Sequence, residues 1–215
     1  EAGVALIISE IIGIDIKLNY LLLAKRPPIY FQRLSLDVGS ETVEADEFIE
    51  DKRANIAIPI KPLEPALRWI EKQDHVSLTA DSIPLTIIGA GLAGVEVALA
   101  LRHRWPLRSL QLKAHIGKPR SALRRALFAA RIKLIADESC LSGPAILCTG
   151  VHSPRWLEAS GLQVDSSGRV LTRESLQVIK YPRLFAVGDC GVIAKSSRPA
   201  SGVWAVRAAK PLAIN

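Results

Sequence analysis

Hydrophobic residues in the first part of the chain form short runs separated by polar turns, a pattern typical of β-rich segments. Residues 4–24 are rich in Val, Ile and Leu and predict two strands around a turn near residues 15–19. Residues 28–40 predict a further strand that ends at a glycine, and residues 41–54 predict a charged surface connection. We therefore expect strands, rather than helices, in this part of the chain.

The middle of the chain alternates between strand and helix patterns. A short strand is predicted at 56–60 and a helix at 61–73, where Ala66, Trp69 and Ile70 share one face. From residue 84 to residue 150 the order is strand, glycine turn, helix, strand, helix, strand, strand. This order predicts a parallel sheet with helices on its faces.

Short strands and turns return after residue 150. Residues 184–190 (LFAVGDC) predict a buried strand followed by a turn, and a helix is predicted to begin near Ser201. The chain is therefore expected to have an α/β fold. Its middle segment alternates strands and helices, whereas the segments on either side consist mainly of short strands and turns.

Composition narrows the class of protein. The 215 residues are 49% hydrophobic and 23% charged, which is ordinary for a globular chain and excludes disorder. No apolar run reaches the 18 or so residues of a membrane span. The three cysteines form no C-x-x-C pair, and no signal peptide is recognised, so we expect a reducing, cytoplasmic location. The four histidines show no metal-ligand spacing.

The net charge of +7 is concentrated in one segment. Residues 97–136 carry 10 basic and no acidic side chains, so the rest of the chain is slightly acidic. A basic protein invites a nucleic-acid interpretation. Aromatic residues are sparse in this segment, however, and Trp105 stands alone, so the stacking surface of a single-strand binder is missing. We therefore expect no nucleic-acid partner and interpret the segment as a phosphate-facing surface.

Methionine is absent from the sequence, including at position 1. Two explanations are open: the chain is a piece of a longer polypeptide, or methionines and loop residues are missing from it. We expect both to apply. Numbers of residues counted between distant motifs are then unreliable, whereas motifs made of contiguous residues can still be interpreted.

The motif G-x-G-x-x-G occurs at Gly89, Gly91 and Gly94, between an apolar strand and a helix. In dinucleotide-binding folds the first glycine permits the tight turn, the second lets the backbone approach a pyrophosphate, and the third lets helix and strand pack closely. The free N–H groups of the helix start then face the phosphates. A glycine-rich turn without a ligand is the alternative, and the matched context favours dinucleotide binding.

An acidic residue about 20 positions after this motif would bind the ribose 2′-hydroxyl of NAD. The chain instead has Lys113, His115, Lys118 and Arg120 in this region, and no carboxylate from 97 to 136. This basic cluster favours the 2′-phosphate of NADP, with a degenerate site as the alternative. Glu96, two residues past the third glycine, is expected in the first turn of the helix. Its role is either to stabilise the helix dipole or to make a polar contact in the cofactor cleft.

Several motifs, taken in order, resemble those of the two-dinucleotide-binding flavoproteins, the pyridine nucleotide-disulfide oxidoreductase and NADH dehydrogenase-like family. IGAGLAGVEVALAL resembles the second nucleotide motif of that family, and AILCTG resembles the segment that closes its NAD(P)H domain at Gly150. LSLDVGS resembles the corresponding segment of the FAD domain. LFAVGDC resembles the second FAD motif, which implies that Asp189, after Gly188, contacts the flavin ribityl chain.

Two further segments narrow the resemblance. IPIKPLEPALRW and RPASGVWAVRAAKPLAIN are similar to the NADH dehydrogenase-like module that is fused ahead of selenide, water dikinase in some proteins. The family begins with a G-x-G-x-x-G for FAD, and this chain has no second such motif. The resemblance therefore implies that residue 1 falls inside the FAD domain. It also places Trp204 near the flavin, with a core or interface aromatic as the alternative.

These motifs imply a Rossmann-like NAD(P)-binding domain inserted into a partial FAD-binding domain. The expected divisions are 1–82 for the first FAD part, which lacks the N-terminal FAD glycine motif, 83–150 for the NAD(P)H domain, and 151–215 for the second FAD part.

The resemblance implies an FAD-dependent oxidoreductase that transfers a hydride from NAD(P)H to flavin and on to an unidentified small-molecule acceptor. The expected partners are a selenide, water dikinase domain in cis and a second copy in a homodimer. No catalytic residue and no metal ligand is assigned. Two alternatives remain: a non-catalytic NAD(P)-binding regulatory or scaffold module, and a sulfide:quinone oxidoreductase-like enzyme that uses Cys190 or Cys148.

Overall fold

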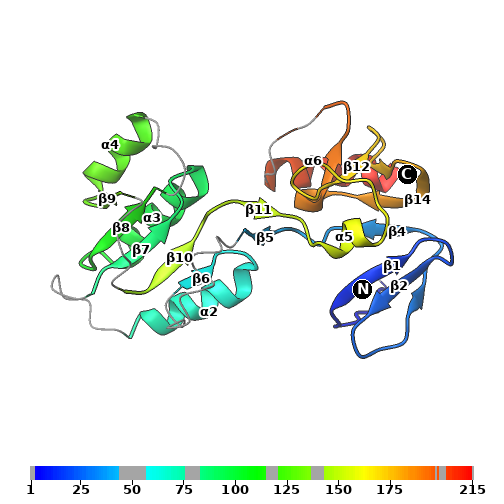
Figure 1. Ribbon diagram of the computed structural model, residues 1–215, viewed down its shortest axis with the longest axis horizontal. Coiled ribbons are helices and arrows are strands. Elements are labelled where there is room, and N and C mark those ends of the chain that lie inside the picture. The colour runs from blue at the N-terminus through cyan, green and yellow to red at the C-terminus, as the bar shows by residue number, and fades with distance from the viewer. Residues whose placement is uncertain are drawn as a thin grey trace. The chain divides into compact units, whose positions relative to one another are not determined.

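The computed structural model describes residues 3–43, 57–75, 83–114, 121–136, 143–196, 198 and 202–214. The chain divides into two compact units. The first consists of Glu1–Ser40 together with His152–Asn215, and the second of Glu41–Val151. Figure 1 labels the elements of both units. One unit is therefore built from two separated stretches of chain, and the other is inserted between them.

The second unit is built on a five-stranded sheet in the order β6-β10-β7-β8-β9. Every neighbouring pair in it is parallel. Its strands are β6 (Ala57–Pro59), β7 (Leu85–Ile88), β8 (Leu110–Lys113), β9 (Lys133–Ile135) and β10 (Ala145–Leu147). The predicted parallel sheet is thus confirmed, and β6 joins it as a fifth strand.

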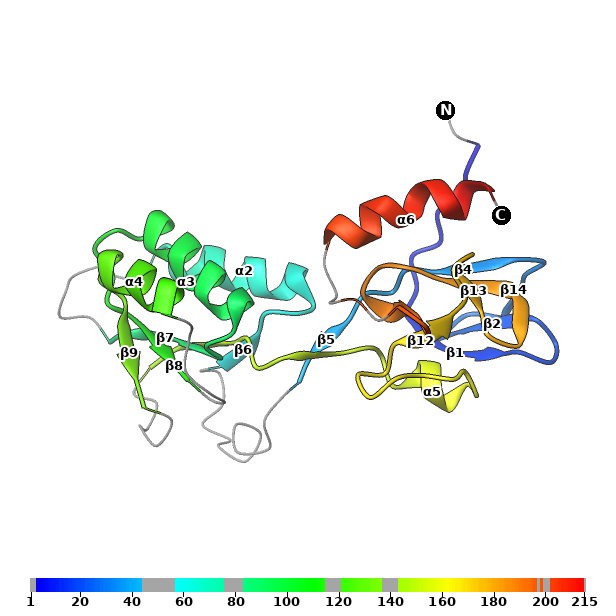
Figure 2. The same ribbon diagram turned by 90° about the horizontal axis from the view of Figure 1, so that it is seen from above.

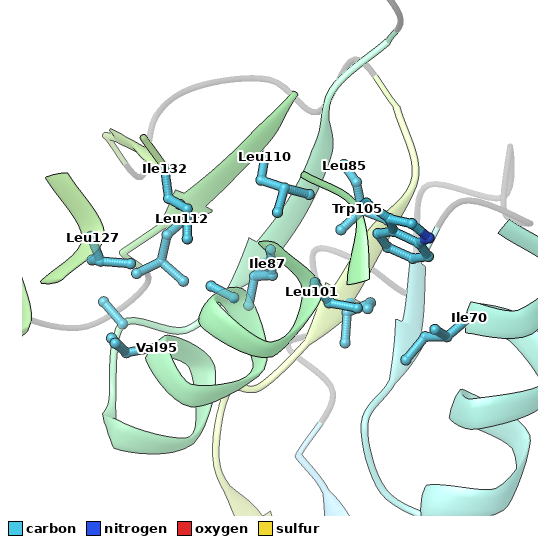
Figure 3. Packing of buried hydrophobic residues seen from close by; sticks show 13 residues of the cluster. Ile70, Leu85, Ile87, Val95, Leu101, Trp105, Leu110, Leu112, Leu127 and Ile132 are labelled. Carbon is cyan, nitrogen blue, oxygen red and sulfur yellow. The ribbon is translucent and has the colours of Figure 1, made fainter. Parts of the chain in front are cut away.

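Three helices lie on one face of this sheet, as Figure 2 shows. They are α2 (Leu63–Gln73), α3 (Leu92–Arg104) and α4 (Ser121–Ala129). Alternate strand residues such as Leu85 and Ile87 point to the helices and pack against Val95, Leu101 and others (Figure 3). In a strand every second side chain faces the helices, and in a helix side chains three or four positions apart face the sheet. These two sets of apolar side chains meet and form one core between the layers.

The C-terminal ends of α2 and α3 are joined by a polar cluster around Asp74. The Asp74 carboxylate accepts hydrogen bonds from the Arg104 guanidinium, at 2.8 and 2.5 Å, and from the indole Nε1 of Trp105, at 2.7 Å. Arg108 is buried, stacks over the Trp105 ring at 4.7 Å and donates to Gln73 at 2.9 Å. These contacts join the end of α2 to the end of α3 and to the residues that follow it.

The first unit contains a second five-stranded sheet, in the order β15-β12-β13-β14-β4. The pairs β14–β4 and β12–β15 are parallel, whereas β13 runs antiparallel to both of its neighbours. Its strands are β4 (Leu34–Leu36), β12 (Val170–Thr172), β13 (Gln177–Val178), β14 (Tyr181–Ala186) and β15 (Gly191–Ile193).

Helix α6 (Gly202–Ile214) lies over one face of this sheet (Figure 2). Its Ala208 and Leu212 pack against Leu176, Phe185 and Val187. A second cluster, with Leu36 and Leu184 at its centre, covers the opposite face. That cluster draws on α5 (Trp156–Ala159) and on an antiparallel sheet of β1 (Ile11–Asp15), β2 (Tyr20–Leu23) and β3 (Ile29–Tyr30).

The division of the chain differs from the expected one at its first boundary. The sequence groups residues 41–82 with the first FAD part, whereas the structure assigns 41–75 to the inserted unit. The reason is strand pairing, since β6 pairs with β10 and α2 packs on the same core as α3. The connecting segments themselves pair, as β5 (Glu41–Thr42) with β11 (Val151–His152).

Within the described ranges, no helix has both the length and the apolar composition that crossing a membrane requires.

Candidate functional site

The glycine motif forms the turn between β7 and α3. Gly89 directly follows β7 and has φ +113°, a region that side-chain-bearing residues rarely adopt. A Cβ on Gly89 would also overlap the carbonyl of Cys148 at the end of the neighbouring strand. Glycine is therefore required here both by the backbone angle and by the closeness of β10.

Gly91 and Gly94 have different roles. A Cβ on Gly94 would overlap the carbonyl of Gly89, so this glycine allows α3 to pack closely on its strand. A Cβ on Gly91 would project into open space. Gly91 is also the N-cap of α3 and makes no side-chain capping hydrogen bond, and the next two residues are exposed. The free N–H groups of this helix start are thus open to an anionic ligand.

The end of β8 lies next to this turn. The Gly89 N–H donates to the Lys113 carbonyl at 2.9 Å, which fixes the strand end beside the first glycine. Lys113 itself is buried, with 6% of its surface exposed, so little of its side chain is open to a ligand. His115, Lys118 and Arg120 lie outside the described residues. The described part of this region is therefore the end of β8, held beside the first glycine.

Two more predicted site residues are described in this unit. Glu96 is exposed and lies in the second turn of α3, beyond the four free N–H groups, so the expected place in the first turn is wrong. Gly150 has φ +125°, and its carbonyl accepts a hydrogen bond of 3.0 Å from the Val43 N–H. It therefore lies where the inserted unit ends, as the resemblance implies for a closing segment.

The predicted flavin motif forms a separate site in the first unit. Asp189 lies in the short 3-10 helix η1 (Gly188–Cys190) directly after β14 and is partly exposed. Its carboxylate accepts a hydrogen bond of 3.1 Å from the Ser40 hydroxyl. Gly188 has φ +63°, and a Cβ there would overlap the Asp37 carboxylate. The parallel pairing of β4 with β14 brings these residues together.

Sequence reasoning assigned no role to three neighbours of Asp189. Ser40 and Asp37 are contacts of this turn, and the Ser153 hydroxyl donates to the Asp189 carbonyl at 3.4 Å. The resemblance of LSLDVGS to an FAD-domain segment was the available signal for Asp37 and Ser40. No comparable signal marked Ser153.

The described cysteines do not have the environment of redox-active thiols. Cys190 is fully buried, with Sγ 3.2 Å from the Val187 carbonyl, and burial raises its pKa. Burial also raises the pKa of Cys148, to about 12. A reactive thiol needs an exposed site that stabilises the thiolate, which neither residue has. Cys140 lies outside the described residues.

Two further features of the described residues concern base stacking and metal binding. Trp105, the one aromatic residue considered for base stacking, is buried and bonded to Asp74. Within the part of the chain that the structure describes, no group of three or more His, Cys, Asp or Glu residues could hold a metal ion.

No family model matches the sequence. Among curated proteins, it is 23% identical to human ferroptosis suppressor protein 1 over 84% of this chain and 55% of that protein. It is 22% identical to the mouse protein over 85% of this chain and 56% of that one. The chain thus spans about half the length of the curated relatives it matches.

Solved structures have the same architecture. Water-forming NADH oxidase from Lactobacillus brevis, bound to NADH, aligns over 96% of this chain and 52% of its own, with TM-score 0.78 and 16% identity. An engineered water-forming NADPH oxidase, bound to NADPH, has TM-score 0.75 and 17% identity over 95% of this chain and 52% of its own. Putidaredoxin reductase in complex with putidaredoxin has TM-score 0.76 and 20% identity over 95% and 56%.

These alignments define the class of fold: an α/β fold with a parallel sheet, shared with the two water-forming oxidases and putidaredoxin reductase. The expected fold class is thereby confirmed. Among named proteins, the chain is similar in sequence to ferroptosis suppressor protein 1 and similar in structure to the water-forming oxidases.

Proposed function

We propose that this chain is the nucleotide-binding part of an FAD-dependent NAD(P)H oxidoreductase. The observation that carries the proposal is the open N-terminus of α3, where Gly91 leaves room for a pyrophosphate beside the end of β8. The partly exposed Asp189, held by Ser40, supports a ribityl contact at the second site.

The two cofactors, when bound, supply hydride transfer from nicotinamide to flavin, and the protein supplies position and electrostatics. The N–H groups of Leu92 and Ala93 would bind the dinucleotide phosphates, helped by the positive end of the α3 dipole. The Asp189 carboxylate would accept a hydrogen bond from a ribityl hydroxyl, and the Ser40 contact orients that carboxylate. Gly188 keeps the turn narrow enough for Asp37 to lie against it.

We further infer a preference for NADPH. The strand after the glycine motif ends at Lys113, Ala114 follows it, and no carboxylate occurs as far as residue 136. The engineered NADPH oxidase replaces an aspartate by alanine and the following alanine by arginine, which supports the same reasoning. His115, Lys118 and Arg120 are the residues proposed to meet the 2′-phosphate.

The fusion to selenide, water dikinase also belongs to this proposal, and it is supported by the sequence segments that resemble that fused module. The electron acceptor is proposed to be a small molecule, and a homodimer is the proposed assembly.

The decisive experiment is anaerobic titration of the full-length protein with NADPH and with NADH, following flavin bleaching. We expect bleaching by both cofactors and tighter binding of NADPH. The triple variant His115→Ala, Lys118→Ala, Arg120→Ala should weaken NADPH at least tenfold and leave NADH unchanged, because two or more charged contacts to the 2′-phosphate are lost. A colourless protein that does not bind added FAD would contradict the flavin proposal. Nucleotide binding without flavin reduction would instead support the regulatory module.

A further inference from the structure

A cavity of about 150 Å³ lies between α6 and the sheet of the first unit. Its apolar lining includes Leu176, Ala186, Val187 and Val192. An apolar cavity of about this volume in another protein is large enough to hold benzene. The cavity therefore has room for a body of about the size of one aromatic ring.

Three arginines line the same cavity, namely Arg169, Arg198 and Arg207. Arg169 is held in place, because its guanidinium pairs with the Asp165 carboxylate at 2.7 Å and also donates to the Arg198 carbonyl at 2.7 Å. The second of these bonds fixes the backbone of Arg198 next to the sheet. The position of Arg198 thus depends on its hydrogen bond from Arg169.

The other two guanidinium groups gather on Trp204. The guanidinium carbons of Arg198 and Arg207 lie 4.0 and 4.9 Å from the centroid of its ring. Both guanidinium groups therefore contact the same indole ring, which also lines the cavity. The indole ring attracts both cations through its negative face and so offsets part of their mutual repulsion.

Neither of these guanidinium groups has a carboxylate partner among the described residues. Asp165 neutralises Arg169, and Glu174 is the one acidic residue among the described residues that line the cavity. Two uncompensated guanidinium groups against one carboxylate leave the cavity with a net positive charge. The cavity therefore combines apolar walls with cationic groups in its lining.

We propose that this cavity binds a small organic anion, a carboxylate or phosphate carried on a body no larger than one aromatic ring. The apolar walls contact the body, and Arg198 and Arg207 bind the anionic group. The anion-binding groups, Arg198 and Arg207, belong to neither proposed cofactor site, although Gly188 of the candidate flavin turn also lines the cavity.

The test is isothermal titration of the whole protein with benzoate and phenyl phosphate, with benzyl alcohol and inorganic phosphate as reference ligands. We expect both ring-bearing anions to bind. Benzyl alcohol should bind at least tenfold more weakly because it lacks the charge, and inorganic phosphate more weakly because it lacks the ring. A stronger response to phenyl phosphate than to benzoate would identify a phosphate ester as the ligand type, and the reverse a carboxylate.

Matched variants locate the binding. Arg198→Gln with Arg207→Gln should lower the affinity for benzoate at least tenfold, since two charge-assisted contacts are removed. Arg68→Gln, an exposed arginine of α2 paired with Glu64, is the control and should change nothing. Both arginines are exposed, so circular dichroism should show an unchanged fold. Unchanged affinity in the double variant, or displacement of benzoate by FAD, would overturn a separate anion site.

Discussion

The hydroxyl of Ser40 donates a hydrogen bond of 3.1 Å to the carboxylate of Asp189, across 149 positions of sequence. The inserted unit lies between these two residues in the chain, yet the parallel pairing of β4 with β14 brings them together. The candidate flavin contact is therefore built by two segments that both belong to the first unit.

Removing this carboxylate should weaken flavin binding. We expect Asp189→Ala to lower FAD affinity by about 1.5–3 kcal/mol, the range for hydrogen bonds to a charged group. Ser40→Ala should cost less, about 1 kcal/mol, because the carboxylate remains and only its orientation is loosened. Equilibrium dialysis with FAD measures both effects, and equal losses in the two variants would argue against a direct ribityl contact.

The second and third glycines of the turn should respond differently to alanine. Gly91→Ala adds a methyl group in open space, so folding should be unaffected while NAD(P)H affinity falls at least tenfold. Gly94→Ala forces the methyl group against the Gly89 carbonyl and should destabilise the fold by about 1–3 kcal/mol. Thermal unfolding and nucleotide fluorescence separate the two outcomes. Normal nucleotide binding by Gly91→Ala would contradict the proposed pyrophosphate position.

Cysteine chemistry should make no contribution to turnover. The pKa of about 12 at Cys148 keeps its thiol protonated at neutral pH, and Cys190 is fully buried. Cys148→Ala and Cys190→Ala should therefore retain flavin reduction by NAD(P)H, although the second variant is expected to lose some stability because it leaves a small cavity. Flavin reduction by sulfide in the wild-type protein that is lost in either cysteine variant, with FAD still bound, would instead support the sulfide:quinone alternative.

The polar cluster at the ends of α2 and α3 should make the free energy of unfolding decrease at acidic pH. Hydrogen bonds from Arg104 and then Trp105 lower the pKa of Asp74 from 3.8 to about 2. Because the folded pKa is lowered, this residue stabilises the fold above pH 3.8, and the contribution is lost as the pH falls towards 2. The variant Asp74→Asn should be less stable at neutral pH. Its free energy of unfolding should also change less with pH between these two values.

Denaturant titration at several pH values measures this effect. Glu64→Gln, which removes an exposed i,i+4 ion pair with Arg68 on the same helix, is a suitable control. If the free energy of unfolding changed equally steeply with pH below 4 in the wild-type protein and in Asp74→Asn, the stabilising role of the Asp74 carboxylate would be contradicted.

The strand–turn–helix at the glycine motif could be predicted because its determinants are local. The apolar run of β7, the three glycines and the start of α3 all lie within about 20 contiguous residues. The same holds for the strands and helices that follow as far as β10, since each is marked by its own hydrophobic period.

The pairing of β6 with β10 could not be predicted in the same way. The sequence marks 56–60 as a strand, but no local signal states which sheet it joins. The choice depends on α2, whose Ile70 packs with Leu101 and Trp105 on the core of the inserted unit. The contacts of Asp37, Ser40 and Ser153 with the Asp189 turn depend in the same way on long-range strand pairing.

The pairing of β5 with β11 has a consequence for how this chain can be cut and rejoined. The inserted unit leaves and re-enters the surrounding chain through two neighbouring strands, so its two ends are adjacent. Adjacent ends are the condition under which a unit can be excised or transplanted without stretching its host. A short linker from Ser40 to His152 should thus let the first unit fold without the insertion, and residues 41–151 should fold as a separate unit.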